Sequence, residues 1–266
     1  MPTPPHRSRR ARTLALCAVP VLALLLTAAF APLPFAVARP GTTNVDVLGS
    51  YQNKPVISIS GAGTRRTSGQ LRMVTILVTG PQTDIGLSDV ISGWFRTDRA
   101  VMPREAVYPS GQTDQQIERH NVADMKKSQD SATSAALSYL HRSPKDVKVS
   151  LSLADVGGPS AGMMFALGVV DKIDGDGRGG DLTGGKSISG TGTIAPDGTV
   201  GPVGGVALKT QAARHEGATI FLVPKEECSD AKAELPKGLR LIPVTKLADA
   251  ITSLRSLSAG QSVPHC

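Results

Sequence analysis

The chain has 266 residues and a formal net charge of +7 at pH 7, and aromatic side chains make up 3% of it. Four of the positive charges are arginines near the N-terminus (Arg7, Arg9, Arg10 and Arg12), so the rest of the sequence is only mildly basic. Because no stripe of lysine and arginine alternates with aromatic residues, the composition argues against nucleic-acid binding. The roughly 225 residues beyond the N-terminal segment are enough to bury one core.

An uncharged, mostly apolar run extends from Thr13 to Ala38, directly after the arginines. About twenty apolar residues suffice for a helix to span a bilayer, and the arginines favour a cytoplasmic location for the short basic tail, residues 1–12. We therefore expect residues 13–38 to be a single transmembrane helix or signal anchor in the cell membrane, with the following chain extracytoplasmic. The triplet Ala36-Val37-Ala38 also fits the small-x-small pattern of a cleaved signal peptide, which is the alternative. Three prolines would kink or shorten such a helix: Pro20, Pro32 and Pro34.

Residues 41–110 contain strand-like runs that glycine, serine and threonine separate. The two clearest strands are residues 55–60 and 71–79, and residues 88–95 are compatible with a short helix. We expect a strand-rich N-terminal part of the exported region here.

Residues 111–260 mix helical and strand-like patterns, which predicts an α/β or α+β domain, and residues 261–266 are a C-terminal tail. The helices are expected at residues 114–141, 160–173, 205–216, 226–234 and 246–257, and the strands at 147–153, 187–203, 219–223 and 240–244.

The most informative stretch is Gly157-Gly158-Pro159-Ser160-Ala161-Gly162, between a predicted strand and a predicted helix. A serine at such a turn lies near the unpaired N–H groups of a helix start, where the helix dipole favours negative charge. That environment stabilises the oxyanion that forms when a hydroxyl attacks a carbonyl. Gly158 allows a tight turn, and Pro159 suits the first helical turn. The alternative interpretation is a glycine-rich loop with a capping serine.

A second glycine-rich turn, residues 202–205, leads into a short helix with Lys209 in its first turns. Apolar neighbours such as Val206 and Leu208 can desolvate the amine, which lowers its pKa and allows it to act as a base. A serine needs an adjacent base to become a useful nucleophile, and a Ser–Lys pair is one known solution. Taken alone, Lys209 is compatible with an ordinary surface lysine.

Together these segments resemble the proteolytic domain of the Lon protease family. The matching pieces, in the family's order and spacing, are residues 158–162, 189–194, 198–205, Lys209 and 217–224. The resemblance implies that Ser160 is the nucleophile, Lys209 the general base, and Thr191 a residue that orients the lysine, with Gly158 and Pro159 supporting the turn. It implies no cofactor. The more common family form has an aspartate three residues before the serine, where this chain has Gly157.

Residues 102–109 and 128–130 are similar to the membrane-anchored, single-chain Lon-like proteases of Gram-positive bacteria. Those relatives usually insert a peptide-binding PDZ domain before the strand that leads to the serine, but here only residues 142–146 occupy that place. Substrate recognition is therefore expected from the active-site cleft, from residues 41–110 or from a partner. The resemblance also allows a homo-oligomer, because family members often form rings.

Cys228 and Cys266 are the only cysteines beyond the apolar run, which itself contains Cys17. An even pair in an oxidising compartment predicts a disulfide, and two free thiols are the alternative. No metal-ligand spacing is present, so we expect no metal site.

Residues 180–187 match the phosphate-loop pattern G-x-x-x-x-G-K-[ST], but a polar loop precedes them and a strand-like segment follows. A phosphate loop needs a buried strand before it and a helix after it, so we expect no ATP binding.

The sequence thus predicts a membrane-anchored, ATP-independent serine endopeptidase that uses a Ser-Lys dyad on extracytoplasmic proteins or peptides, in protein catabolism or quality control. Two alternatives are a catalytically idle, protease-like scaffold that binds peptides and a protein that processes only itself.

Overall fold

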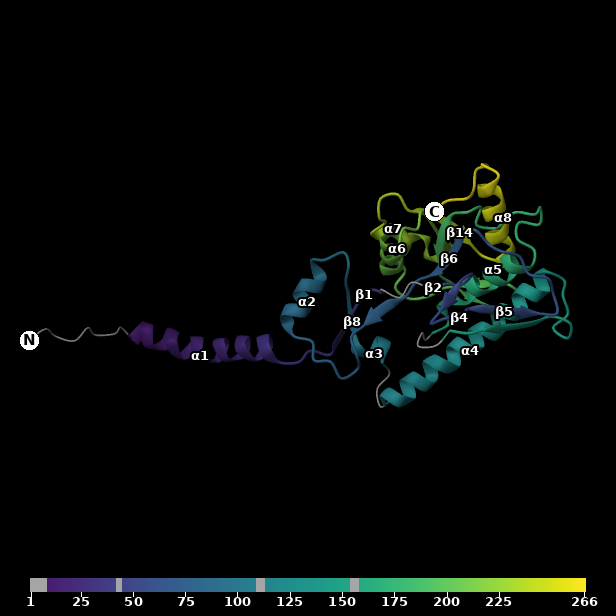
Figure 1. Cartoon of the computed structure of the whole chain (residues 1–266). Helices are drawn as coiled ribbons and strands as arrows, with labels where there is room; N and C mark the ends of the chain where they lie inside the picture. Colours follow the sequence, from purple (N-terminus) through teal and green to yellow (C-terminus); the bar gives the residue numbers. More distant parts are fainter. Residues whose placement is uncertain (1–8, 42–44, 109–112, 154–157) are drawn as a thin grey trace, which may run out of the picture. The chain divides into compact units, whose positions relative to one another are not determined.

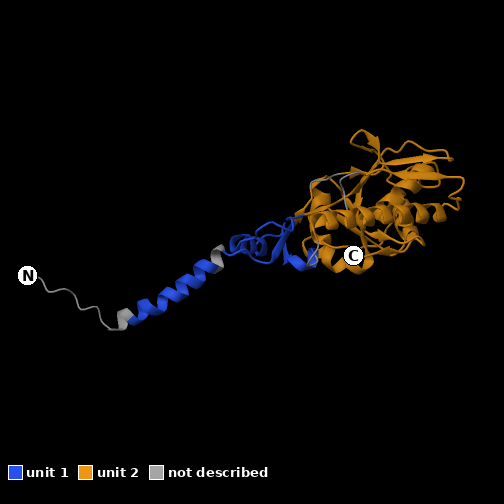
Figure 2. Cartoon of the chain, turned by 90° about the horizontal axis from the view of Figure 1, so that it is seen from below, with its two compact units in different colours: residues 1–38, 78–110 blue, residues 39–77, 111–266 orange. Residues whose placement is uncertain are grey.

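The computed structural model describes residues 9–41, 45–108, 113–153 and 158–266, with segments 9–12 and 28–30 described by their backbone alone (Figure 1). The chain divides into two compact units (Figure 2). Unit 1 comprises residues 1–38 and 78–110, and unit 2 comprises residues 39–77 and 111–266.

Unit 1 is organised around a three-stranded sheet with the order β7-β1-β8, in which β1 and β8 pair antiparallel. Its elements are α1 (Arg9–Phe30), β1 (Phe35–Pro40), β7 (Ile76–Val78), α2 (Leu87–Trp94), β8 (Ala100–Pro103) and α3 (Arg104–Val107), and the unit boundary falls within β1 and β7. A small apolar cluster of Val37, Ile85 and Val90 joins the sheet to α2.

The apolar run that we expected to be one helix over residues 13–38 is divided in the structure. Helix α1 contains Pro20 and ends at Phe30, and β1 begins at Phe35. Pro32 and Pro34 explain the break, because proline cannot donate a backbone N–H and clashes with the preceding turn. In the part of the chain that the structure describes, no helix combines the length and the apolar character needed to cross a membrane.

Unit 2 contains a five-stranded sheet with the order β14-β13-β10-β6-β2, and all neighbours except the β6–β2 pair are parallel. The sheet strands are β2 (Val45–Asp46), β6 (Gln70–Met73), β10 (Ser187–Gly190), β13 (Ile220–Pro224) and β14 (Arg240–Val244). Three short pairs complete the strands: β3 (Ser50–Tyr51) with β4 (Lys54–Pro55), β5 (Ile57–Ser60) with β9 (Lys148–Leu151), and β11 (Thr193–Ile194) with β12 (Val200–Gly201).

Helices cover both faces of this sheet. They are α4 (Asp114–Tyr139), α5 (Gly162–Ile173), α6 (Val206–His215), α7 (Cys228–Ala233) and α8 (Leu247–Ser258), with the 3-10 turns η1 (Pro159–Ala161) and η2 (Lys225–Glu227). Along β13, Ile220 and Leu222 join the core shared with α4, α5 and α8, whereas Phe221 and Val223 join the core shared with α6 and α7. Successive side chains of a strand point to opposite faces, so a strand of continuous apolar residues belongs between two helical layers.

The mixed α/β architecture confirms the predicted fold class. The strand-rich part expected at residues 41–110 contributes to both units: β2 and β6 form one side of the main sheet in unit 2, and residues 78–110 belong to unit 1. The strand expected at residues 71–79 is two strands, β6 and β7, in different sheets.

Candidate active site

Ser160 lies in η1, directly before the long buried helix α5. Gly158, at the start of this turn, has φ +90°, a conformation that side chains with a Cβ rarely adopt. Pro159 is exposed, Ser160 is half-buried and Ala161 is buried. The turn therefore presents the serine at the surface of a rigid core. Gly157, where the family more commonly has aspartate, lies outside the described residues.

Helix α4 fixes this turn from the side. The hydroxyl of Ser128 donates to the carbonyl of Pro159 at 3.0 Å, and the N–H of Gly158 donates to the carbonyl of Asn121 at 3.3 Å. A Cβ added at Gly162 would lie 2.8 Å from the Ser128 oxygen, so the turn packs closely against α4. Residues 128–130 stood out in the sequence only through their similarity to Lon-like proteases, and the bracing role of Ser128 is visible only in the structure.

Thr191 connects the serine turn to the lysine. Its hydroxyl donates to the backbone carbonyl of Ser160 at 3.2 Å and accepts a hydrogen bond from Lys209 Nζ at 3.2 Å. The N–H of Gly192 donates to the same Ser160 carbonyl at 2.9 Å. Ser160, Thr191 and Lys209 therefore lie together. Among the described residues, the Ser160 hydroxyl and the Lys209 amine share no direct hydrogen bond.

Lys209 is a buried lysine in the first turns of α6. Gly205 precedes the helix in the left-handed conformation, φ +69°, and turns the chain into it. The side chain of Lys209 is 4% exposed. Burial lowers the pKa of Lys209 to about 8, and the charge of Glu227 opposes this shift. A substantial share of the amine is neutral at a pH near this pKa, which is what a general base requires.

A pocket of about 240 Å³ lies beside the serine turn, lined by Lys127 and Ser131 of α4 together with Pro159 and Ile194. A shallower hollow of about 550 Å³ follows α4, and Lys127 and Ser131 line it as well. The two hollows share these lining residues, and the smaller one reaches Pro159, directly before Ser160; we call them together the groove along α4.

The family model described as the Lon protease (S16) C-terminal proteolytic domain matches residues 125–255. The match supports a Lon-type proteolytic domain in this segment, which we call the Lon domain. The match supports a peptidase of the serine type. The Lon domain contains Ser160, Thr191 and Lys209 and the elements from most of α4 to most of α8. A search of curated proteins finds no match to the chain.

Glu227 is a residue of the Lon domain that sequence reasoning missed. It is 8% exposed, and its Oε1 accepts the N–H of Val203 at 3.0 Å. Its Oε2 is buried and has no hydrogen-bond partner among the described residues. Burial raises the pKa of Glu227, and the Val203 N–H and the Lys209 charge partly offset that effect. No local pattern distinguishes Glu227 from its exposed neighbour Glu226, so only the folded chain identifies it.

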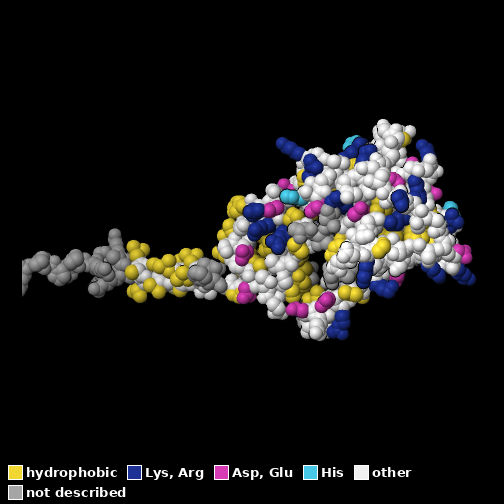
Figure 3. Space-filling model, viewed as in Figure 1, with side chains coloured by type: hydrophobic (Ala, Val, Ile, Leu, Met, Phe, Trp, Pro, Cys, Tyr) yellow, Lys and Arg dark blue, Asp and Glu magenta, His cyan; other side chains and the backbone are white. Residues whose placement is uncertain are grey.

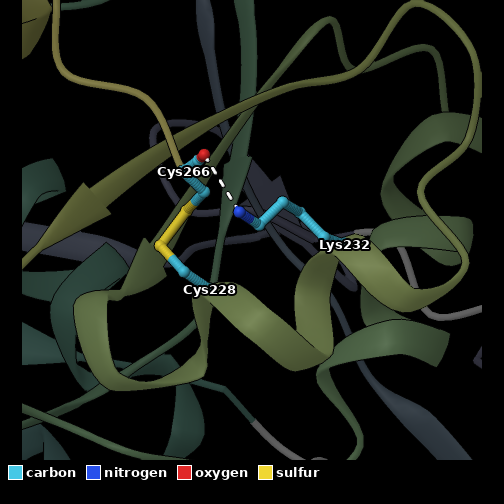
Figure 4. The surroundings of a disulfide bond; sticks show 3 residues. All are labelled: Cys228, Lys232 and Cys266. Atoms are coloured by element: carbon cyan, nitrogen blue, oxygen red, sulfur yellow. Dashed lines mark hydrogen bonds between the residues drawn. A yellow bond between two sulfur atoms is a disulfide. The ribbon is translucent and has the colours of Figure 1, made fainter.

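Cys228 and Cys266 form a disulfide with a Cα–Cα distance of 5.4 Å and a sequence separation of 38 (Figure 4). Lys232 Nζ donates to the carbonyl of Cys266 at 3.2 Å, which ties the same two segments together a second time. The bridge joins the start of α7, directly after Glu227, to the C-terminus. Cys17 is a free cysteine on α1.

The segment that matches the phosphate-loop pattern has a different structure. Arg65 lies against the start of this segment and the loop before it, and its guanidinium donates to the carbonyls of Gly179 and Gly180, each at 2.6 Å. The segment continues into β10 rather than into a helix. It therefore lacks the helix start that holds phosphates in nucleotide-binding loops.

Proposed function

We propose that this protein is a membrane-anchored, ATP-independent serine endopeptidase that hydrolyses extracytoplasmic proteins or peptides with a Ser160–Lys209 dyad. The observation that carries the proposal is the shared partner Thr191, which bonds both the serine turn and the lysine amine. The family of residues 125–255 supports it independently.

In the proposed reaction, the neutral amine of Lys209 takes the proton of the Ser160 hydroxyl as its oxygen attacks the peptide carbonyl. The lysine then gives this proton to the leaving amine, and an ester to Ser160 remains. Lys209 next takes a proton from a water molecule that attacks the ester, and it returns this proton to the Ser160 oxygen as the ester bond breaks and the second product leaves. Because the N–H of Gly158 already donates to Asn121, we assign the oxyanion to the N–H of Ser160 instead of that of Gly158.

The groove along α4 is the proposed place for the polypeptide. It ends beside the serine turn and offers polar and apolar contacts on one helix. In this proposal the groove captures the substrate in place of the PDZ domain that the resemblance leads one to expect.

Membrane anchoring through α1 is supported by its exposed apolar side chains. Eight of them are 55–74% exposed: Leu14, Leu16, Val19, Val21, Leu22, Leu24, Leu25 and Leu26. Figure 3 shows hydrophobic side chains along the described part of this helix. In the same unit, Trp94 and Phe95 at the end of α2 are 70% and 85% exposed. Tryptophan is enriched where a membrane protein meets the lipid headgroups.

The proposal is tested by comparing the membrane and secreted proteomes of a wild-type strain and a Ser160→Ala strain. We expect specific extracytoplasmic proteins to accumulate uncleaved in the Ser160→Ala strain. A serine-reactive probe should label the wild type and a Ser152→Ala control, but not Ser160→Ala.

Two results would separate the alternatives. Equal labelling of all three proteins would contradict the nucleophile and favour an idle scaffold. A mass difference between mature wild type and Ser160→Ala, with no other changed protein, would indicate self-processing.

A further inference from the structure

We infer that Glu227 is a positioning residue for Lys209: its carboxylate holds the loop that leads into α6 and supplies the negative charge that acts on the lysine amine. This inference rests on the proposed role of Lys209 as the general base.

The first role follows from the hydrogen bond to Val203. Glu227 Oε1 accepts the Val203 N–H at 3.0 Å, and α6 begins three residues later at Val206. The loop between them is rich in glycine, and Gly205 has positive φ. Glycine-rich backbone gains little order from its own side chains. An external acceptor therefore fixes the direction in which α6, and with it Lys209, leaves the loop.

The second role follows from the oxygen that remains. Glu227 Oε2 is buried without a hydrogen-bond partner among the described residues. A buried carboxylate oxygen in that state is costly unless a nearby charge compensates for it. The charges that act on Glu227 are Lys209 from α6, Glu226 from η2 and Asp230 from α7. Lys209 is the one cation among them, so it is the compensating group.

The interaction works in both directions. The charge of Glu227 raises the pKa of Lys209 against the effect of burial, and the charge of Lys209 lowers the pKa of Glu227. Within the described residues the two groups form no direct ion pair, so the carboxylate acts on the amine through its charge without direct contact. A direct ion pair would keep the amine protonated, whereas a carboxylate without direct contact raises the pKa of Lys209 only in part.

The backbone segment that carries Glu227 is itself held in place. Cys228 follows it directly and is bonded to Cys266. The carboxylate is thus carried on a turn that a covalent bridge and a buried strand, β13, hold on its two sides.

The test compares Glu227→Gln with Glu226→Gln, which removes the same charge from an exposed neighbour. For each full-length protein, kcat/KM for a fluorogenic peptide is measured across pH, and thermal unfolding verifies the fold. We expect Glu227→Gln to move the acid limb of the profile to lower pH by about half a unit or more and to reduce the plateau rate. Glu226→Gln should leave both unchanged. Glu227→Asp, which keeps the charge, should return the limb close to its wild-type position.

An unchanged acid limb in folded Glu227→Gln would overturn the inference and leave Glu227 a structural role alone. An equal displacement by Glu226→Gln or by Glu227→Asp would also overturn it, because the effect would not depend on the Glu227 charge.

A second measurement separates this inference from the proposed function. The pKa of Lys209 is read from the ¹³Cε chemical shift of labelled lysine, with Lys209→Arg identifying the signal. A lower pKa in Glu227→Gln supports the inference even in a protein without Ser160-dependent cleavage, and an unchanged pKa contradicts it whatever the enzyme does.

Discussion

Thr191→Val removes the hydroxyl that joins the serine turn to the lysine and keeps most of the side-chain volume. Two hydrogen bonds of 3.2 Å are lost, one to the Ser160 carbonyl and one from the Lys209 amine. Thr191 is 1% exposed, so water cannot replace either partner. Thr191→Ser is the matched control, because it keeps the hydroxyl and loses only a methyl group.

The expected magnitude follows from the kinds of bond. A neutral hydrogen bond contributes about 1 kcal/mol and one to a charged group about 1.5–3 kcal/mol, so the pair is worth about 2–4 kcal/mol. If this energy is used to align the amine in the transition state, kcat/KM falls by about 30- to 1000-fold. Thr191→Ser should stay within about tenfold of wild type, because a lost methyl group costs about 1 kcal/mol.

The assay is kcat/KM of purified full-length protein on a fluorogenic peptide at a pH above 8, where the Lys209 amine is mostly neutral. Thermal unfolding of the same samples shows whether the folded state persists. A folded Thr191→Val enzyme within threefold of wild type would refute the reasoning, since the hydroxyl would then have no part in orienting the base.

Four further predictions concern Lys209, the disulfide and the single tryptophan. Lys209→Arg should be inactive because a guanidinium does not deprotonate. In the wild type, kcat/KM should rise with pH through an apparent pKa near 8. A flat profile from pH 6 to 10 would contradict the role of Lys209 as the general base. The same pKa, lowered from 10.5, means that the unfolded protein binds more protons than the folded one between about pH 8 and 10.5. The free energy of unfolding therefore rises with pH across that window, and the penalty for burying the charged amine is fully present below about pH 8. Lys209→Met should accordingly stabilise the protein at pH 7 by up to about 3 kcal/mol, measured by denaturant titration. No gain in stability would count against a buried charge at Lys209. Cys266→Ser opens the bridge that closes 38 residues and should lower the free energy of unfolding by about 3–4 kcal/mol, with Cys17→Ser as the control; equal midpoints for the two variants would show that the bridge adds nothing. Trp94 is the single tryptophan of the chain and is 70% exposed, so membrane anchoring predicts that its fluorescence shifts to the blue and is quenched by brominated lipids in vesicles; emission that vesicles leave unchanged speaks against the anchor.

Local patterns were sufficient for the elements around the candidate site. Strand β14 has the predicted bounds, 240–244, and α6 lies within the predicted helix 205–216. Both are short segments whose apolar spacing and flanking glycines determine them locally. The Ser160 and Lys209 motifs were visible for the same reason, because a glycine-rich turn is written in consecutive residues.

Local sequence patterns did not predict the contacts between residues that are distant in the chain. The hydrogen bonds that link the serine turn to Asn121 and Ser128 join segments that are far apart in sequence. Glu227 and Glu226 are chemically identical in sequence and differ only in what the fold packs around them. Likewise, the split between β6 and β7 follows from their partners, β10 and β1, and not from residues 71–79.

The position of β6 has a practical consequence for recombinant work. The family match begins at residue 125, but β10 pairs along its length with β6, residues Gln70–Met73, and β2 lies beyond β6. A fragment trimmed to the matched residues would carry β10 as a bare edge, a template for intermolecular strand addition. A recombinant piece that keeps this sheet intact therefore has to retain residues 39–77 together with the matched segment.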